Sequence, residues 1–166
     1  MEAAAGWLAG LLAPWVDLYS STSWLEVVIS FLHVGALVAA GGLAFALDRA
    51  VLHGKRHGRS RRTELASELE SAHRAVVVGL GVVVLSGVAL TAADPETYLV
   101  SWVFWGKMVV VLLLLANGWF LKRAGERIAT DPEDGVAVSR LRGAALRSVG
   151  LWALAVLAGV ALTVSA

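Results

Sequence analysis

Four long apolar runs constrain the fold of this chain more than any other feature. They cover about residues 24–47, 75–92, 101–121 and 148–164, and each can cross a hydrocarbon layer of about 30 Å as a helix. With 58% hydrophobic residues among 166, the chain has more apolar surface than a soluble core of this size could bury. The sequence therefore predicts an all-α integral membrane protein, a bundle of four transmembrane helices.

The basic residues lie in two of the three connections between these runs. Seven flank or fill the first connection and six the third: Arg49, Lys55, Arg56, Arg59, Arg61, Arg62 and Arg74, then Lys122, Arg123, Arg127, Arg140, Arg142 and Arg147. The positive-inside rule places both connections in the cytoplasm and both termini outside, in the periplasm or extracellular space. The expected location is a bacterial inner membrane, crossed four times. Because topology accounts for the basic cluster at 55–62, no nucleic-acid partner is expected.

A shorter segment precedes the first membrane run. Trp7, Leu11 and Trp15 recur at a helical spacing, which predicts an amphipathic helix within residues 1–22, lying on the outer membrane surface or covering the bundle. Ser23 and Glu26 form a capping box, so the first membrane helix and the four-helix domain, residues 23–166, are expected to begin there.

Two Asp-Pro-Glu sequences predict further helix starts, because Asp is a common N-cap and Pro suits the first helical position. Asp94-Pro95-Glu96 is expected to open the third membrane helix on the outer side. Thr130-Asp131-Pro132-Glu133 is expected to open the fourth on the inner side.

The first membrane run carries its polar residues on one side. On an α-helix, Glu26, Ser30, His33 and Asp48 project within an arc of roughly 60°. Lipid offers such groups no partner, so the stripe is expected to face protein, a cavity or a cofactor. A capping role for Glu26 and a plain hydrogen bond from His33 to a neighbouring helix are the structural alternatives.

Lys107 is the basic residue that lies inside a membrane run rather than in a connection. Counted from the expected caps at Ser23 and Asp94, His33 lies ten residues into its helix and Lys107 thirteen. Both helices enter from the outside, so the two residues are expected within about one turn, ~5 Å, of the same depth. Ser86 of the antiparallel second run falls nearby.

This level of the bundle is a candidate cofactor site. A neutral imidazole is a good ligand for haem iron, and its second ring nitrogen needs an acceptor, for which Ser30 lies one turn away. Lys107 could neutralise a haem propionate, donate a proton or act as a sixth ligand. Snorkelling of Lys107 toward the outer interface is the alternative.

The remaining histidines lie toward the cytoplasmic side. His53 and His57 are four residues apart, and with His73 and Asp48 they could form a second metal site or simply be solvated. By helical rise, His73 lies roughly 20 Å or more from His33, so the two cannot ligate one haem within a single chain. A homodimer could supply a second ligand. The chain has no cysteine, which excludes thiolate metal sites and thioether-linked haem.

The run from Phe31-Leu32-His33-Val34-Gly35 through Gly42 to Leu47-Asp48-Arg49 resembles the first-helix pattern of the CopD/HemJ-like superfamily of small bacterial membrane proteins. Leu85-Ser86-Gly87 and Trp105-Gly106-Lys107-Met108, with Asn117-Gly118, are similar to its second- and third-helix patterns, so the resemblance covers about residues 25–123. In the protoporphyrinogen oxidase branch it implies that His33 binds haem b and that Lys107 is essential, hence a candidate catalytic residue. In the CopD-type branch it implies copper resistance or uptake, although the two methionines, Met1 and Met108, form no Met-rich array.

Three classes of function follow from the sequence. The leading hypothesis is a haem b-binding protein with a redox or electron-transfer role, a porphyrin being one candidate substrate, in which His33 ligates the iron and Ser30, Ser86 and Lys107 surround the cofactor. The second is a protein that transports copper or another small solute along the polar stripe. The third is a non-catalytic accessory subunit whose glycine-rich faces pack on a larger membrane complex. The sequence leaves open whether the protein is an enzyme.

Overall fold

The computed structural model describes residues 2–53, 59–131 and 134–165, and their regular structure is helical throughout. The helices are α1 (Glu2–Ser21), α2 (Ser23–His53), α3 (Arg59–Ala93), α4 (Pro95–Val100), α5 (Trp102–Thr130) and α6 (Gly135–Ser165). Four of these regions are long and apolar enough to cross a membrane: α2, the Ser71–Ala93 part of α3, α5, and α6 up to Val164. The predicted all-α, four-span membrane fold is confirmed at this level.

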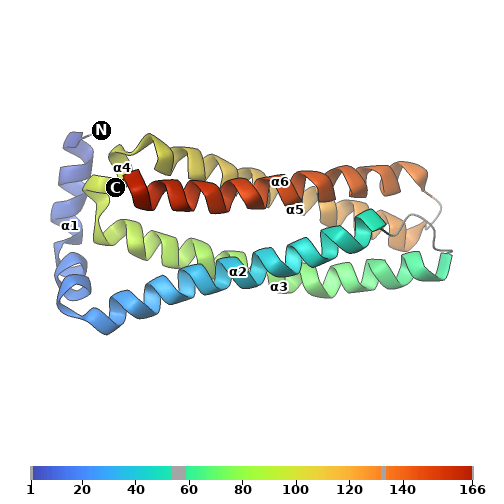
Figure 1. Cartoon of the computed structure of the whole chain (residues 1–166), viewed down its shortest axis with the longest axis horizontal. Coiled ribbons are helices and arrows are strands. Elements are labelled where there is room, and N and C mark those ends of the chain that lie inside the picture. The colour runs from blue at the N-terminus through green and yellow to red at the C-terminus, as the bar shows by residue number, and fades with distance from the viewer. Residues whose placement is uncertain (1, 54–58, 132–133, 166) are drawn as a thin grey trace.

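The four long helices form a bundle in which each packs against two others (Figure 1). The helix α2 contacts α3 and α6, and α5 also contacts α3 and α6. Within the described ranges, α2 and α5 do not contact each other, and neither do α3 and α6, so each of these pairs lies on a diagonal of the bundle. Residues on α2 and α5 can therefore face each other across the core.

Small residues let neighbouring helices approach closely. A Cβ atom on Gly79 of α3 would lie 2.8 Å from the Cβ of Ala40 on α2, a distance that real side chains do not reach. On the other flank of α2, Gly41 lies against the ring of Trp152 from α6. Such contacts between small residues are the usual way in which membrane helices pack, because lipid gives them no hydrophobic reason to associate.

Helix α1 crosses one end of the bundle instead of running along it (Figure 1). Its Trp15 indole donates a hydrogen bond to the backbone carbonyl of Ala89, near the end of α3, over 3.1 Å. The side chains of Trp7, Leu11 and Leu18 remain exposed. Helix α1 thus covers the end of the bundle, and its contact with a membrane surface stays a prediction.

The helix starts differ in part from those expected. Asp94 caps the separate six-residue helix α4, accepting a hydrogen bond from the Thr97 amide over 3.1 Å. The long helix α5 begins after Ser101, whose extended backbone breaks the helix and whose hydroxyl accepts from the Phe104 amide. The first residue of the third apolar run, Ser101, is therefore the cap of the third membrane helix.

The fourth membrane helix also begins later than expected. Asp131 ends α5, and the carboxylate that caps α6 is that of Asp134, which accepts from the amides of Val136 and Ala137, each over 2.9 Å. Residues 132 and 133 of the expected start signal lie outside the described residues.

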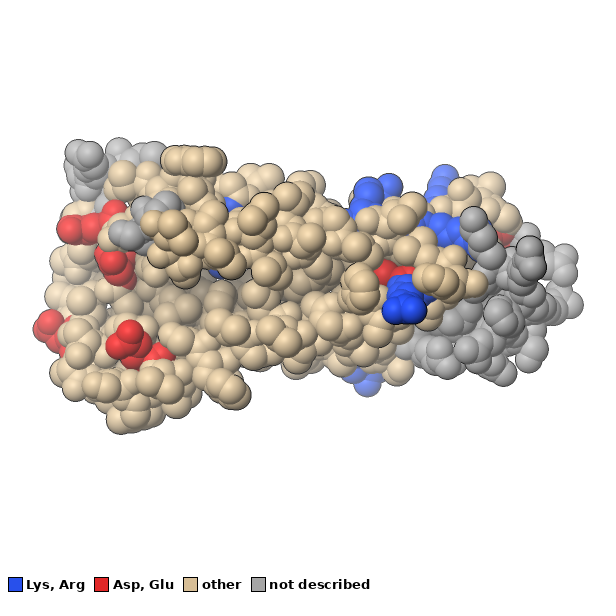
Figure 2. Space-filling view, viewed as in Figure 1, with Lys and Arg blue, Asp and Glu red and all other residues tan. Residues whose placement is uncertain are grey.

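Charge is distributed unevenly along the bundle (Figure 2). On the face shown, most carboxylates gather at the end that α1 covers, and most Lys and Arg side chains gather toward the opposite end. Between these ends the outward-facing residues of the long helices are mainly apolar, including Phe31, Val38, Leu112 and Leu157. This pattern suits a protein whose middle section contacts lipid.

Candidate functional site

The polar side chains of α2 become more buried along the helix. Glu26 is exposed in the first turn, Ser30 and His33 are half-buried, and Asp48 retains only 2% of its exposure. A carboxylate in the first turn interacts favourably with the helix dipole, which is consistent with a local role for Glu26. The predicted stripe thus turns toward protein at its deeper positions.

His33 is hydrogen-bonded to the neighbouring helix α3. Its Nδ1 atom lies 3.0 Å from Oγ of Ser86. The Ser86 hydroxyl donates its hydrogen to the carbonyl of Val82 over 2.6 Å, with the carbonyl of Val83 at 3.2 Å. With the hydroxyl hydrogen directed at Val82, Ser86 Oγ is left to accept from His33, which assigns the ring proton to Nδ1. In a neutral ring this leaves the lone pair of Nε2 available to a metal or a proton.

The His33 ring also lies against the backbone of Gly87. A Cβ atom at position 87 would be 3.2 Å from Cε1 and 3.6 Å from Nδ1 of His33, so any larger residue would displace the ring. Gly87 follows Ser86 directly on α3. Two consecutive residues of α3 therefore contact the His33 ring: Gly87 packs against it, and Ser86 accepts its Nδ1 proton.

Lys107 reaches the same level from α5. Its Nζ atom lies 3.8 Å from where a Cβ atom on Gly159 of α6 would be, and its charge interacts with the His33 ring on α2. The Lys107 side chain is half-buried, and it forms no ion pair with any carboxylate in the part of the chain that the structure describes. The ammonium group is thus held among α2, α5 and α6.

We call these five residues, His33, Ser86, Gly87, Lys107 and Gly159, the His33 layer. The layer draws on all four membrane helices. Because α2 and α5 lie on a diagonal, the imidazole and the ammonium group approach from opposite sides of the bundle. A free nitrogen lone pair and a cation in one layer suit a ligand that has both an electron-accepting metal centre and an anionic substituent.

The residues predicted around His33 are only partly brought together. Ser86 provides the acceptor for the Nδ1 proton, the role that the sequence suggested for Ser30. Ser30 stays on α2, half-buried, one turn before His33. The close approach of α2 and α3 explains the difference, since it brings a serine from another helix within reach of the ring.

The other histidines are separate from the His33 layer. His73 faces α5, where its Cε1 atom lies 3.8 Å from where a Cβ atom on Gly118 would be, and its surroundings include Lys122 and Glu126. Thirteen residues separate His73 from Ser86 on α3, which corresponds to about 20 Å. The two histidines are therefore too far apart to ligate one haem within the chain.

A second metal site has no support among the described residues. His53 is exposed, and its Nδ1 atom bonds to the Arg49 carbonyl of its own helix over 2.8 Å. His57 lies outside the described residues. Among the side chains that the structure describes, no group of three or more His, Cys, Asp or Glu residues could hold a metal ion.

The arginine-rich end of the bundle contains polar contacts that the sequence did not predict. The buried Ser148 side chain of α6 interacts with buried Asp48, whose Oδ2 atom has no hydrogen-bond partner among the described residues. Buried Asn117 of α5 donates to the carbonyl of Ala144 over 2.9 Å and accepts from Nε of Arg147 over 3.2 Å. Asn117 is the single amide side chain of the sequence and lies in an apolar run, a signal that could have marked it.

Comparison with protein families, curated proteins and solved structures finds no match to this chain. The resemblance noted over residues 25–123 therefore stays a prediction. What the His33 layer binds must be inferred from its own chemistry.

Proposed function

We propose that this protein binds haem b in the membrane, with Nε2 of His33 as an axial ligand of the iron. The observation that carries the proposal is the hydrogen bond between His33 Nδ1 and Ser86, because it favours the tautomer in which Nε2 is free to ligate. Histidines that bind metals generally donate their other ring proton to such an acceptor.

The remaining residues of the layer fit the same ligand. Lys107 brings an ammonium group into the His33 layer, and among the described residues no carboxylate forms an ion pair with it. This cation can pair with an anionic propionate of haem. Gly87 keeps the His33 ring in place by packing directly against it. Bound haem would supply one-electron redox chemistry, and we propose a redox or electron-transfer role on that basis.

The location that we propose follows the charge pattern. The arginine-rich end of the bundle would lie in the cytoplasm, and α1 and both termini would lie on the outer side of a bacterial inner membrane. Reactivity of single introduced cysteines toward a membrane-impermeant thiol reagent tests this orientation, because the native chain has no cysteine. Labelling of Ser21→Cys in intact cells, without labelling of Ser139→Cys, is expected.

A visible spectrum of the detergent-purified protein after addition of haem tests the cofactor directly. The wild-type protein is expected to give a Soret band that shifts on reduction, and His33→Ala is expected to abolish it. His73→Ala removes the same side chain about 20 Å away on α3 and is the matched control, which should retain the band. A flat wild-type spectrum, or equal loss in both variants, would contradict the proposal.

Copper transport has less support, since the described residues contain no group of three or more side chains that could hold a metal ion. It would give stoichiometric copper without a Soret band. An accessory role would give neither signal and would instead be indicated by stable co-purification with other membrane proteins.

A further inference from the structure

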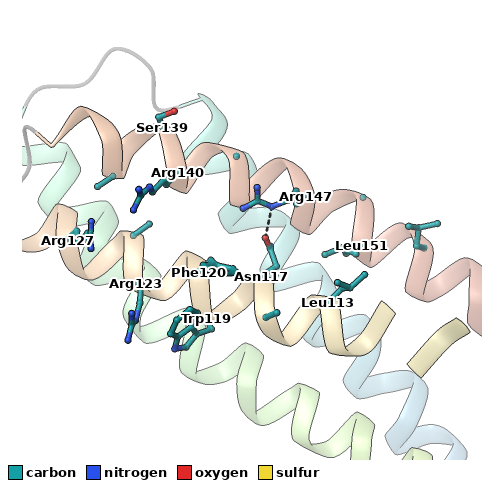
Figure 3. A pocket seen from close by; sticks show the side chains of 16 residues that line it. Leu113, Asn117, Trp119, Phe120, Arg123, Arg127, Ser139, Arg140, Arg147 and Leu151 are labelled. Carbon is teal, nitrogen blue, oxygen red and sulfur yellow. Dashed lines mark hydrogen bonds between the residues drawn. The ribbon is translucent and has the colours of Figure 1, made fainter. Parts of the chain in front are cut away.

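An open groove of about 930 Å³ runs between α5 and α6 toward the arginine-rich end of the bundle (Figure 3). It is distinct from the His33 layer and shares no residue with it. Four of its 16 lining residues are arginines and none is acidic: Arg123, Arg127, Arg140 and Arg147. Among the described residues, the ion pair of this region joins Lys122 to Glu126 and uses none of these arginines. The groove therefore gathers positive charge from both α5 and α6.

The side chains that line the groove change from charged to apolar along its length. Arg127 and Arg140 line one end, and Leu113 and Leu154 line the other. Fourteen residues of helix separate Arg127 from Leu113, which corresponds to about 21 Å. A ligand that fills this groove would therefore be anionic where the arginines line it and apolar beyond Arg147, toward Leu113 and Leu154.

Arg147 is held in place by the buried polar contact on α5. The Asn117 amide is fixed by its bond to the Ala144 carbonyl, and this directs its Oδ1 atom toward Nε of Arg147. The dashed line in Figure 3 marks that second bond. Because Asn117 uses only Nε, the terminal nitrogens of Arg147 remain free of it and can donate to an anion.

Arg123 is similarly positioned by an aromatic ring. Its guanidinium carbon lies 4.1 Å from the centroid of the Trp119 ring. Tryptophan is common at the level of lipid headgroups, so this pair lies where phosphates are expected. Arginine at such a level pairs readily with phosphate through several hydrogen bonds at once.

We propose that this groove is a binding site for an anionic phospholipid of the leaflet at the arginine-rich end. The phosphate would pair with the arginines, and an acyl chain would follow the apolar wall past Leu113 and Leu154. Basic pockets between membrane helices are known to suit such lipids. Arg140 and Arg147 are two turns apart on α6, about 10 Å by helical rise, so a lipid with two phosphates can engage both.

The first test measures lipid affinity by native mass spectrometry of the full chain in detergent. Cardiolipin is the probe, and phosphatidylcholine is the zwitterionic comparison. The double variant Arg140→Gln/Arg147→Gln is expected to lose about 30-fold in cardiolipin affinity, since each arginine near the surface contributes about fivefold. The control, Arg74→Gln/Arg142→Gln, removes the same charge from positions that do not line the groove and should change affinity less than threefold or so.

A second variant tests the apolar part of the groove and leaves every charge in place. Gly150 lines the groove, is exposed, and has no atom within 4 Å of where its Cβ would be, so Gly150→Leu fills the groove without disturbing the fold. The affinity of this variant for cardiolipin is expected to fall. Inorganic pyrophosphate, which needs only the arginines, should displace cardiolipin at the same concentration as in wild type. Gly81→Leu, at an equally open and exposed position on α3, is the control and should bind like wild type.

Three results would overturn the proposal. Equal losses in the groove and control arginine variants would indicate a non-specific charge effect. Wild-type cardiolipin affinity in Gly150→Leu, with pyrophosphate competing in full, would indicate a site for a free anion. Equal affinity of the wild-type protein for phosphatidylcholine and cardiolipin would show that the arginines do not select an anionic lipid.

Discussion

His33 and Ser86 join α2 to α3 through one hydrogen bond of 3.0 Å, and the Ser86 hydroxyl is itself bonded to the carbonyl of Val82. This short chain of donors sets the protonation of a histidine inside a membrane bundle without using a charge. An acidic partner would bind the same proton more strongly, but it would also bring a carboxylate into the apolar region, at a considerable cost in solvation.

Ser86→Ala should weaken haem binding without abolishing it. Without the serine oxygen, His33 loses the acceptor that fixes its tautomer, and loss of such a partner typically lowers metal affinity about 10- to 100-fold. Titration of the purified protein with hemin measures the change. Thr91→Val is the control, because the Thr91 hydroxyl also donates to its own helix on α3, over 2.9 Å to the Gly87 carbonyl, whereas the hydrogen bond to His33 comes from Ser86. Equal weakening in both variants would contradict a specific role for Ser86.

Lys107→Met should lower the midpoint potential of the bound haem. A nearby cation favours the reduced state, which carries one positive charge less than the oxidised state. An interaction on the order of 1 kcal/mol corresponds to about 40 mV for one electron. Spectroscopic redox titration measures the shift. Lys122→Met, which removes an exposed lysine near the arginine-rich end of α5, should leave the potential unchanged within about 10 mV.

Gly79→Ala should destabilise the bundle. The added Cβ would lie 2.8 Å from the Cβ of Ala40, so α2 and α3 would have to separate, at a cost of about 1–3 kcal/mol. Thermal unfolding in detergent measures the loss. Gly81→Ala is the control, two residues further along α3, where no atom lies within 4 Å of the added Cβ. If both variants unfold at the same temperature as wild type, the close contact at Gly79 is not needed for stability.

Ser148→Ala should also lower stability, because it removes the buried hydroxyl that interacts with buried Asp48. Loss of a partner from a buried polar group costs about 1–3 kcal/mol. The loss is expected to shrink when the same change is made together with Asp48→Asn, since the two side chains act as a pair. Exposed Ser139 serves as the control position, where Ser→Ala should have little effect. Additive losses in the double variant would indicate that the two residues act independently.

Tyr98→Phe should reduce the loss of stability that alkali causes at the end of the bundle that α1 covers. Burial, and then the nearby charge of Asp94, raises the pKa of the Tyr98 phenol above its ordinary value of 10.0. The stability that the neutral phenol contributes is complete below about pH 10 and is lost as the pH rises through the raised pKa of the folded state. Unfolding midpoints measured between about pH 8 and pH 11 should therefore fall less in the variant than in wild type. Parallel curves for both proteins would contradict this role.

The fold could be predicted because membrane physics leaves few alternatives. An apolar run of about 20 residues can satisfy its backbone in lipid only as a helix, so run length and composition define the four long helices. The local starts were harder to predict. Asp94 and Ser101 are both good caps, and the sequence does not say that the chain would use both in succession.

The candidate site could be predicted in part. His33 and Lys107 share a level as expected, although α5 begins after Ser101 and not at Asp94. The predicted pairing depended on the parallel course of α2 and α5, which the charge pattern had already indicated. The role of Ser86 and the contact from Asn117 to Arg147 depend on how each helix is rotated against its neighbour. That rotation is set by contacts between small residues such as Gly79 and Ala40, which composition alone does not reveal.

The position of α1 has a consequence for how the protein is made. Trp15 bonds to Ala89, which follows it by 74 residues, so α1 leaves the ribosome before its binding surface on α3 has been synthesised. Until then the indole, and the apolar side chains beside it, must be accommodated elsewhere, at the lipid surface or by a chaperone. Helix α1 is therefore synthesised before α3 but docks after it, and this docking completes the end of the bundle that α1 covers.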